Sequence, residues 1–221
     1  MTIDLSPIWN AWPFLLKALG VTVFVSLASM ALGFVLGLLV GAGRTYGGRI
    51  LDAVLGFYVD TMRAVPLLVV LVWFYFSLPL LTGRSLDAVT AGIIALGLHL
   101  AAYVGETIRA GLTSVRPGQM RAALAIGMGP VQAVRHVILP QALIRMLPAL
   151  GSLLVIAIKD SAIASVVAVP ELMRQSQILA GKTYRPLEIY TCAMLVYFLL
   201  CFPVARGVDR LYRRLAHLGS S

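Results

Sequence analysis

Two adjacent and opposite charges interrupt a long apolar stretch in the C-terminal half of the chain. Lys159 and Asp160, followed directly by Ser161, lie in a segment that is otherwise apolar from Met146 to Pro170. A charge inside a membrane costs about 2.5–3.5 kcal/mol unless it is paired or faces water. An ammonium group beside a carboxylate and a hydroxyl suits the two charged ends of a zwitterion. We therefore expect these three residues to bind substrate, with a structural ion pair that breaks the helix as the alternative.

A second group of polar residues shares one face of an expected helix. His99, Tyr103 and Glu106 are spaced at i, i+4 and i+7, which places them on one side of a helix. His99 then lies about 10 Å from Glu106 along the helix axis, near the middle of the membrane. We expect His99 and Tyr103 to lie on the substrate path. The alternative for His99 is a hydrogen bond to a neighbouring helix.

Two acid–base pairs are expected at the same depth on neighbouring helices. Asp60 precedes Arg63 by three residues, and Glu106 precedes Arg109 by the same spacing. Each pair adjoins a charge-free run that is about 27 Å long as a helix, and the two runs cross the membrane in opposite directions. The four residues are candidates for a cytoplasmic gate. A static ion-pair cluster, or side chains that reach to the membrane surface, is the alternative.

The composition excludes a soluble or disordered protein. Of the 221 residues, 60% are hydrophobic and 12% charged, and the mean hydropathy is +0.92; a soluble domain carries about 45–50% apolar and about 25% charged residues. The net charge of +9 would favour nucleic-acid binding in a soluble chain. In a chain this apolar it indicates a membrane protein with its basic residues on the cytoplasmic side. We expect a lipid bilayer around the chain and no nucleic-acid partner.

Five apolar runs are long enough to cross the membrane core, which takes about 20 helical residues. They cover residues 14–41, 64–81, 88–105, 146–170 and 189–205. The odd number puts the termini on opposite sides, and the distribution of arginine predicts the N-terminus outside and the C-terminus in the cytoplasm. The first run is too long for the apolar part of a cleaved signal peptide, so we expect it to remain as a span. We predict an all-α membrane protein with one transmembrane domain over residues 1–221.

Small residues form a stripe in the first run. Gly33, Gly37 and Gly41 make two overlapping GxxxG steps, and such a stripe lets another helix approach closely. We expect it to pack against a helix of the same chain. A seam between two chains is the alternative.

No motif of a catalytic or energy-converting site is complete. Gly181-Lys182-Thr183 has the form of the end of a phosphate-binding loop, but Ser176 stands where that motif needs its first glycine. The sequence contains no HExxH, no GxSxG and no Cys/His cluster with metal-ligand spacing. It therefore predicts no catalytic residue, no metal and no bound cofactor, and the energy must come from an ion gradient or a separate subunit.

Residues 114–140 form an expected cytoplasmic segment between the third and fourth runs. A helix is predicted over residues 119–126, and a break at Gly127 separates it from a second short helix, which ends at Pro140 where the next span begins. Two short helices joined by a glycine bend suit docking to a cytoplasmic partner. An amphipathic hairpin on the membrane surface is the alternative.

The residues of this segment resemble the EAA motif of ABC importer permeases, in which coupling helices seat in a groove of the ATPase subunit. The matching positions, which we expect to couple to the ATPase, are Gln119, Arg121, Ala122, Ala123, Gly127 and Pro140. Other segments are similar to motifs of the polar amino acid branch, which includes histidine, arginine, glutamine and glutamate permeases. These segments are Arg63 to Pro66, Ala102-Tyr103 with Glu106 and Arg109, Lys159-Asp160-Ser161, and Glu171-Leu172.

Three positions depart from the family pattern. Arg121 stands where the motif has Glu, which reverses the charge on the docking helix. Ala162 replaces a hydroxyl residue, and Asp60 is a shorter acid where Glu is common.

The resemblance implies the assembly and the mechanism. It implies a type I ABC importer permease of the inner membrane, with five transmembrane helices, that moves polar amino acids by alternating access. Two permease chains, identical or homologous, would pair with two ATPase subunits, which bind the ATP and magnesium, and would receive substrate from an extracytoplasmic solute-binding protein. The chain would not be an enzyme by itself. A gradient-driven transporter with Glu106 or Asp160 as a proton site is the alternative.

Overall fold

The structure, a computed structural model, describes residues 4–215, and all regular elements in this range are helical. A short α1 (Ser6–Asn10) leads into the long α2 (Trp12–Tyr46). The elements that follow are α3 (Gly48–Ala64), α4 (Leu67–Val72), the π-helical turn η1 (Trp73–Ser77), α5 (Leu78–Thr82), α6 (Ala88–Thr113), α7 (Pro117–Ala125), α8 (Pro130–Ala133), the π-helical turn η2 (Val134–Ile138), α9 (Leu139–Asp160), the 3-10 segment η3 (Ser161–Val167), α10 (Leu172–Thr183) and α11 (Pro186–Leu215). The predicted all-α fold is confirmed.

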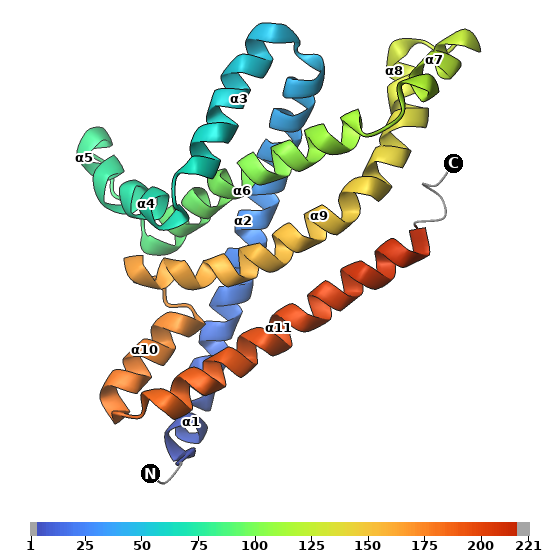
Figure 1. Cartoon of the computed structure of the whole chain (residues 1–221). Coiled ribbons are helices and arrows are strands. Elements are labelled where there is room, and N and C mark those ends of the chain that lie inside the picture. Colours follow the sequence, from blue (N-terminus) through green and yellow to red (C-terminus); the bar gives the residue numbers. More distant parts are fainter. Residues whose placement is uncertain (1–3, 216–221) are drawn as a thin grey trace.

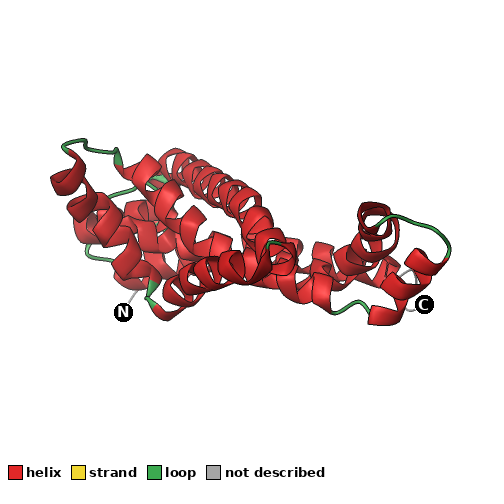
Figure 2. Ribbon diagram, turned by 90° about the horizontal axis from the view of Figure 1, so that it is seen from above, coloured by secondary structure: helices red, strands yellow, loops and turns green. Residues whose placement is uncertain are grey.

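The helices supply four of the five predicted crossings directly, and a fifth only if one bent pair of helices counts as a single span. Four stretches of residues 4–215 are long and apolar enough to cross a membrane by themselves, namely Trp12–Tyr46, Ala88–Thr113, Pro130–Val167 and Pro186–Leu215. A fifth crossing requires α3 and the segment Leu67–Thr82 together, which meet at 103°. Figure 1 shows α1 at one end of the molecule, and α7, α8 and the end of α11 at the other. In Figure 2 this second end projects from the main bundle.

The second crossing is not the straight helix expected over residues 64–81. α3 ends at Ala64, and Val65 is extended, with φ −86° and ψ 130°. Pro66 follows, and a proline disfavours helical backbone at the residue before it and cannot donate an N–H. The chain therefore turns sharply at this point. The charged residues near the end of α3 lie beside this bend and not at the end of a straight span.

The glycine stripe of α2 packs against α6, in the most extensive contact between two helices of the described chain. A Cβ atom built on Gly37 would lie 2.6 Å from Cβ of Val104, and one built on Gly41 would lie 2.6 Å from the carbonyl oxygen of Gly105. The two backbones come this close only because the stripe has no side chains. The expected packing within one chain is confirmed.

The fourth crossing changes from an α-helix to a 3-10 helix directly after Lys159 and Asp160. α9 ends at Asp160 and continues as the 3-10 segment η3. The chain then turns at Ala168, which has a left-handed φ of 63°. α10 follows and packs against α11 and α2 (Figure 1). The expected single stretch over residues 146–170 is thus an α-helix with a 3-10 extension.

Candidate functional site

A cleft of about 420 Å³ lies between α6 and α9, with one side chain of α3 in its lining. Met146, Ala149 and Leu153 form the apolar part of its α9 wall. The polar lining consists of Arg63, Tyr103, Glu106, Thr107, Ser114 and Arg145. A pocket of this size, with a few polar groups on an apolar wall, suits a small polar solute.

Tyr103 of the cleft lies between two neighbouring side chains, Arg63 and His99. The guanidinium carbon of Arg63 lies 5.6 Å from the centre of the Tyr103 ring, a distance at which a cation is attracted to the face of the ring. On α6, the ring of His99 lies 5.2 Å from that of Tyr103. His99 is only 8% exposed, and its Nδ1 has no hydrogen-bond partner among residues 4–215. The alternative for His99, a hydrogen bond to a neighbouring helix, is therefore not found at Nδ1.

An ion network ties three helices together beside the cleft. The Glu106 carboxylate lies 2.6 Å from a guanidinium nitrogen of Arg109 and 2.7 Å from one of Arg44 on α2. Arg44 also lies 3.0 Å from a carboxylate oxygen of Asp52 on α3. The Arg44 side chain is 15% exposed, so it is the most buried charge of the network. Glu106 is thus held by two cations and is not free to take a third.

Within residues 4–215, the α3 members of the expected cluster, Asp60 and Arg63, do not join its ion pairs. Asp60 is exposed in the isolated chain and forms no ion pair with any of residues 4–215. Arg63 lies over the ring of Tyr103 and forms no ion pair with an acid of residues 4–215. The expectation placed both residues at the end of a straight span, whereas they lie beside the bend at Pro66. Arg44 and Asp52, and not Asp60 and Arg63, complete the ion network around Glu106 and Arg109.

Asp160 lies on the same face of α9 as the cleft lining. It follows Leu153 by seven residues, two turns of a helix, so it points to nearly the same side about 10 Å further along. The carboxylate is half-buried and forms no ion pair within the described part of the chain. The alternative of a structural ion pair at Lys159-Asp160 is therefore not found.

The two residues that flank Asp160 do not share its surroundings. Lys159 is exposed and lines shallow pockets against α11, in company with Tyr197 in one of them. Ser161 is fully buried, and its hydroxyl donates to the carbonyl oxygen of Ile158 at 2.7 Å. The three predicted ligands thus do not converge on one point, and Asp160 alone lies on the cleft face.

The predicted coupling segment forms the projecting end of the molecule (Figure 2). α7 begins two residues earlier than expected, and Gly127 ends it with a left-handed φ of 88°, which glycine adopts without strain. Arg121 and Ala122 are exposed, whereas Ala123 is 3% exposed and faces inward. The glycine break is confirmed, and Arg121 lies on the exposed side of α7.

The segment is anchored at its base to the two long helices. Arg145 of α9 donates a hydrogen bond to the carbonyl oxygen of Ser114, the residue directly after α6. Val115 and Ile138 are buried in one apolar cluster, against which Met120 of α7 packs. Gln119 is partly buried. The coupling segment is therefore attached to α6 and α9 by one hydrogen bond and by apolar packing.

Pro140 does not begin a new span, contrary to the prediction. α8, η2 and α9 form one continuous helical stretch from Pro130 to Asp160, and Pro140 is the second residue of α9. The second short helix of the segment thus runs directly into the fourth crossing.

A buried polar cluster at the start of α10 was missed by sequence reasoning. Glu171 is fully buried, and its carboxylate accepts hydrogen bonds from two backbone N–H groups of α10 at 2.6 and 2.8 Å and from the Tyr197 hydroxyl at 2.7 Å. Thr22 of α2 accepts the N–H of Leu172 at 3.0 Å. These partners are 26 and 150 residues apart, so no local spacing signals the cluster. It joins α2, α10 and α11.

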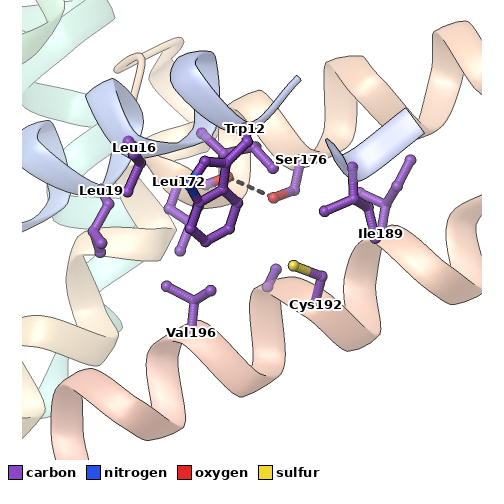
Figure 3. Close-up of a pocket in the computed structure, with 11 residues that line it drawn as sticks. Trp12, Leu16, Leu19, Leu172, Ser176, Ile189, Cys192 and Val196 are labelled. Atoms are coloured by element: carbon purple, nitrogen blue, oxygen red, sulfur yellow. Dashed lines mark hydrogen bonds between the residues drawn. The ribbon is translucent and has the colours of Figure 1, made fainter. Parts of the chain in front are cut away.

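A small cavity lies beside this cluster and is a packing contact. Figure 3 shows Trp12 and Leu16 of α2 facing Leu172 of α10 and Val196 of α11 across it. Its volume is about 10 Å³, and a single water needs about 10–15 Å³. The cavity is therefore too small for a substrate.

The weak nucleotide signal is at the wrong end of a helix. Gly181-Lys182-Thr183 ends α10, whereas phosphate-binding loops precede a helix and use its N-terminus. No group of three or more His, Cys, Asp or Glu among residues 4–215 is placed to hold a metal ion.

Known proteins resemble this chain along almost its whole length. Residues 33–217 match the family described as binding-protein-dependent transport system inner membrane component. The chain is 35% identical over 216 residues to the glutamine transport system permease protein GlnP of Escherichia coli K12, with 97% of this chain and 99% of that protein covered. It is 34% identical over 200 residues to the arginine transport system permease protein ArtQ of Bacillus subtilis 168, with coverage of 90% and 91%.

Solved structures agree with these likenesses. The crystal structure of an amino acid ABC transporter with histidines contains a chain that matches with a TM-score of 0.90 and 34% identity, over 97% of this chain and 100% of that one. An inward facing conformation of the MetNI methionine ABC transporter matches with a TM-score of 0.80 over 93% and 98%, and at 24% identity it bears on the fold alone.

Proposed function

The chain belongs to the family of binding-protein-dependent transport system inner membrane components, and from this membership we propose that it carries polar amino acids or close analogues across the membrane. Its permease role in an ABC importer is shared with its relatives. These relatives give no support to a gradient-driven transporter. The chain has the type I importer permease fold.

The observation that carries the amino acid class is the likeness to amino acid permeases over the whole chain. The GlnP relative covers 97% of the chain, and the chain of the amino acid transporter structure superimposes with a TM-score of 0.90. Because both matches include the cleft between α6 and α9, the substrate class of the relatives is a reasonable guide to the class carried here.

The cleft supplies groups for both ends of an amino acid. Arg63 reaches the cleft without an acidic partner and would attract a carboxylate. Asp160, further along the same face of α9, would receive an ammonium or guanidinium group. His99 and Tyr103 line the path between the ends as polar aromatic surfaces. Lys159 and Ser161 belong to this proposal only as neighbours of Asp160.

The ion network beside the cleft acts as a brace on the cytoplasmic side. Glu106 and Arg109 on α6 are linked through Arg44 to α2 and α3. Opening this side of the path would separate helices that these charges hold together, so we include the network in the gate. Asp60 has no part in it.

Transport follows alternating access driven from the cytoplasm. The ATPase subunits bind ATP and magnesium, and this chain contributes no catalytic residue. Closure of the ATPases would move α7, and the anchoring of α7 to α6 and α9 would carry the movement to the two walls of the cleft. Arg121 on α7 would meet the ATPase surface.

The remaining partners and the topology follow from the same proposal. We place the chain in the inner, cytoplasmic membrane, with the N-terminus outside and α7 and α8 in the cytoplasm. A second permease chain, identical or homologous, completes the path. An extracytoplasmic solute-binding protein delivers the substrate.

Reconstitution tests the energy source. The chain is placed in proteoliposomes with its ATPase and its binding protein, and uptake of labelled amino acids is measured. We expect uptake to require ATP and to continue after the proton gradient is collapsed. Uptake by this chain alone, driven by a pH step, would overturn the proposal.

The variant Asp160→Asn tests the substrate site. It removes the free carboxylate while preserving its shape, so uptake of cationic amino acids should fall at least tenfold, with a much smaller effect on ATP hydrolysis. The matched control is Asp209→Asn, because Asp209 is an exposed acid on α11 and does not line the cleft. Unchanged uptake in Asp160→Asn would remove this residue from the site.

A further inference from the structure

One widened turn interrupts the helix that leads from the coupling segment into the fourth crossing. In η2 the N–H of Leu139 donates to the carbonyl oxygen of Val134, five residues back. An α-helix would make this bond to the residue four back. A π-turn of this kind adds one residue to a single turn of a helix and is frequent at functional sites.

The extra residue keeps a buried stripe on one side of the helix. Ala133, Ile138, Ala142 and Met146 are 0%, 7%, 0% and 3% exposed, and their spacing is five, four and four. In a regular α-helix a step of four stays within about 40° of the starting direction, whereas a step of five ends about 140° away. The widened turn therefore brings Ala133 onto the face that Ile138 and Ala142 bury.

Pro140 lowers the free-energy cost of the π-turn relative to a regular α-helical turn. It has no N–H, so a regular α-helix would leave the carbonyl oxygen of His136 without its usual donor. Nearby side chains also contact the backbone, since the Gln141 amide donates to the carbonyl oxygen of Val137 at 3.0 Å. A second π-turn among residues 4–215, η1, likewise ends two residues before a proline, Pro79.

Proline alone does not produce the widened turn. Pro148 lies inside α9, and the helix remains α-helical around it. Pro140 differs because it follows a π-turn with a buried residue at each end. Ala133 directly precedes the turn and Ile138 is its last residue, and both are buried. Proline removes the competing hydrogen bond, and packing selects the π-turn.

We propose that Pro140 is a positioning residue that fixes the rotation of α9 relative to the coupling segment. This inference rests on the proposed function, because the rotation matters to transport only if α7 and α8 transmit motion from the ATPase. Loss of the extra residue would rotate the segments before and after η2 by about 100° relative to each other. The α9 face that carries Arg145, Leu153 and Asp160 would then no longer be aligned with the docked coupling helix.

The test uses two variants and one control. Pro140→Ala restores the missing donor and permits a regular helix. Pro140→Ala combined with deletion of Arg135, an exposed residue of η2, also permits a regular helix but restores the spacing of four between the buried residues. Pro148→Ala removes a proline from α9 where there is no π-turn.

Two measurements are made on the transporter assembled with its ATPase and binding protein. Spin labels at Ala125→Cys on α7 and Ser152→Cys on α9, in a chain without Cys192 and Cys201, report the relative placement of the two helices. The number of ATP molecules hydrolysed per substrate transported reports coupling. Both labelled positions are exposed.

We expect Pro140→Ala to shift the label distance and to raise ATP consumption per substrate at least fivefold. The deletion variant should restore both values, and Pro148→Ala should change neither. A Pro140→Ala chain with wild-type distance and coupling would overturn the inference. A deletion variant that regains the wild-type label distance but not the wild-type coupling would also overturn the inference. So would failure of both Pro140→Ala and the deletion variant to assemble with the ATPase. Absence of ATP-driven uptake by the wild-type complex would instead overturn the proposed function, and the label distances would still test the helix rotation.

Discussion

The contact between α2 and α6 leads to a quantitative prediction for Gly41→Ala. A Cβ atom at Gly41 would lie 2.6 Å from the carbonyl oxygen of Gly105 and 2.7 Å from Cβ of Ile108, where ordinary contacts are 3.4–4 Å. One obstacle is backbone and the other is the first atom of a side chain, so no change of rotamer relieves the clash. The helices must move apart by most of an ångström. Overpacking of this kind costs about 1–3 kcal/mol.

The control for this variant is Gly20→Ala on the same helix. A Cβ at Gly20 meets nothing within 4 Å. Alanine favours a helix over glycine by about 1 kcal/mol, and this gain is common to both variants. The difference between them therefore isolates the overpacking.

Unfolding of the purified chain in mixed micelles, titrated with a denaturing detergent, measures this difference. Gly41→Ala should be less stable than Gly20→Ala by about 1–3 kcal/mol. Equal stability of the two variants would refute the close approach of α2 and α6. Reduced association between chains with unchanged unfolding would place the stripe at a seam between chains instead.

Three further perturbations test the ion network, the cluster at α10 and the coupling bend. Arg44→Ala removes the shared partner of two acids and should cost about 1–3 kcal/mol in the same unfolding assay, more than Asp52→Asn, whose side chain is half exposed. Glu171→Ala should cost about 1–3 kcal/mol, and its effect should be smaller in a Tyr197→Phe background, since both changes remove the same hydrogen bond; strictly additive losses would contradict the cluster. Gly127→Pro should uncouple ATP hydrolysis from transport while the chain still inserts, because proline cannot adopt a φ of 88°; transport at the wild-type rate would contradict the coupling role.

Apolar length predicted the crossings because the membrane core imposes it on any helix that spans it. The expected run 88–105 lies within α6 and the run 189–205 within α11. The run 64–81 was misread because Pro66 suits the first turn of a helix as well as a break between helices. Residues 48–64 mix apolar with charged residues, so hydropathy did not mark them as a helix. A helix that ends just before Pro66 is what favours a break there over the start of a single helix.

Helical spacing predicted faces but not partners. The pair Glu106 and Arg109 was found because its members are one turn apart. Arg44 was not, because it reaches Glu106 from 62 residues away. The same limit applies to Asp160, whose shared face with Leu153 follows from spacing, whereas the separate surroundings of Lys159 depend on where α11 packs. Long-range contacts are set by tertiary packing and leave no local pattern.

The length of α2 makes the thickness of the bilayer relevant to this molecule. Its 35 residues extend about 52 Å, whereas the hydrocarbon core is about 30 Å thick. The excess is accommodated by tilt, by projection beyond the core, or by both. Because the glycine stripe fixes α6 to α2, a lipid that changes the tilt of α2 moves α6 with it. The acyl-chain length of the surrounding lipid therefore affects the position of α6, which forms one wall of the cleft.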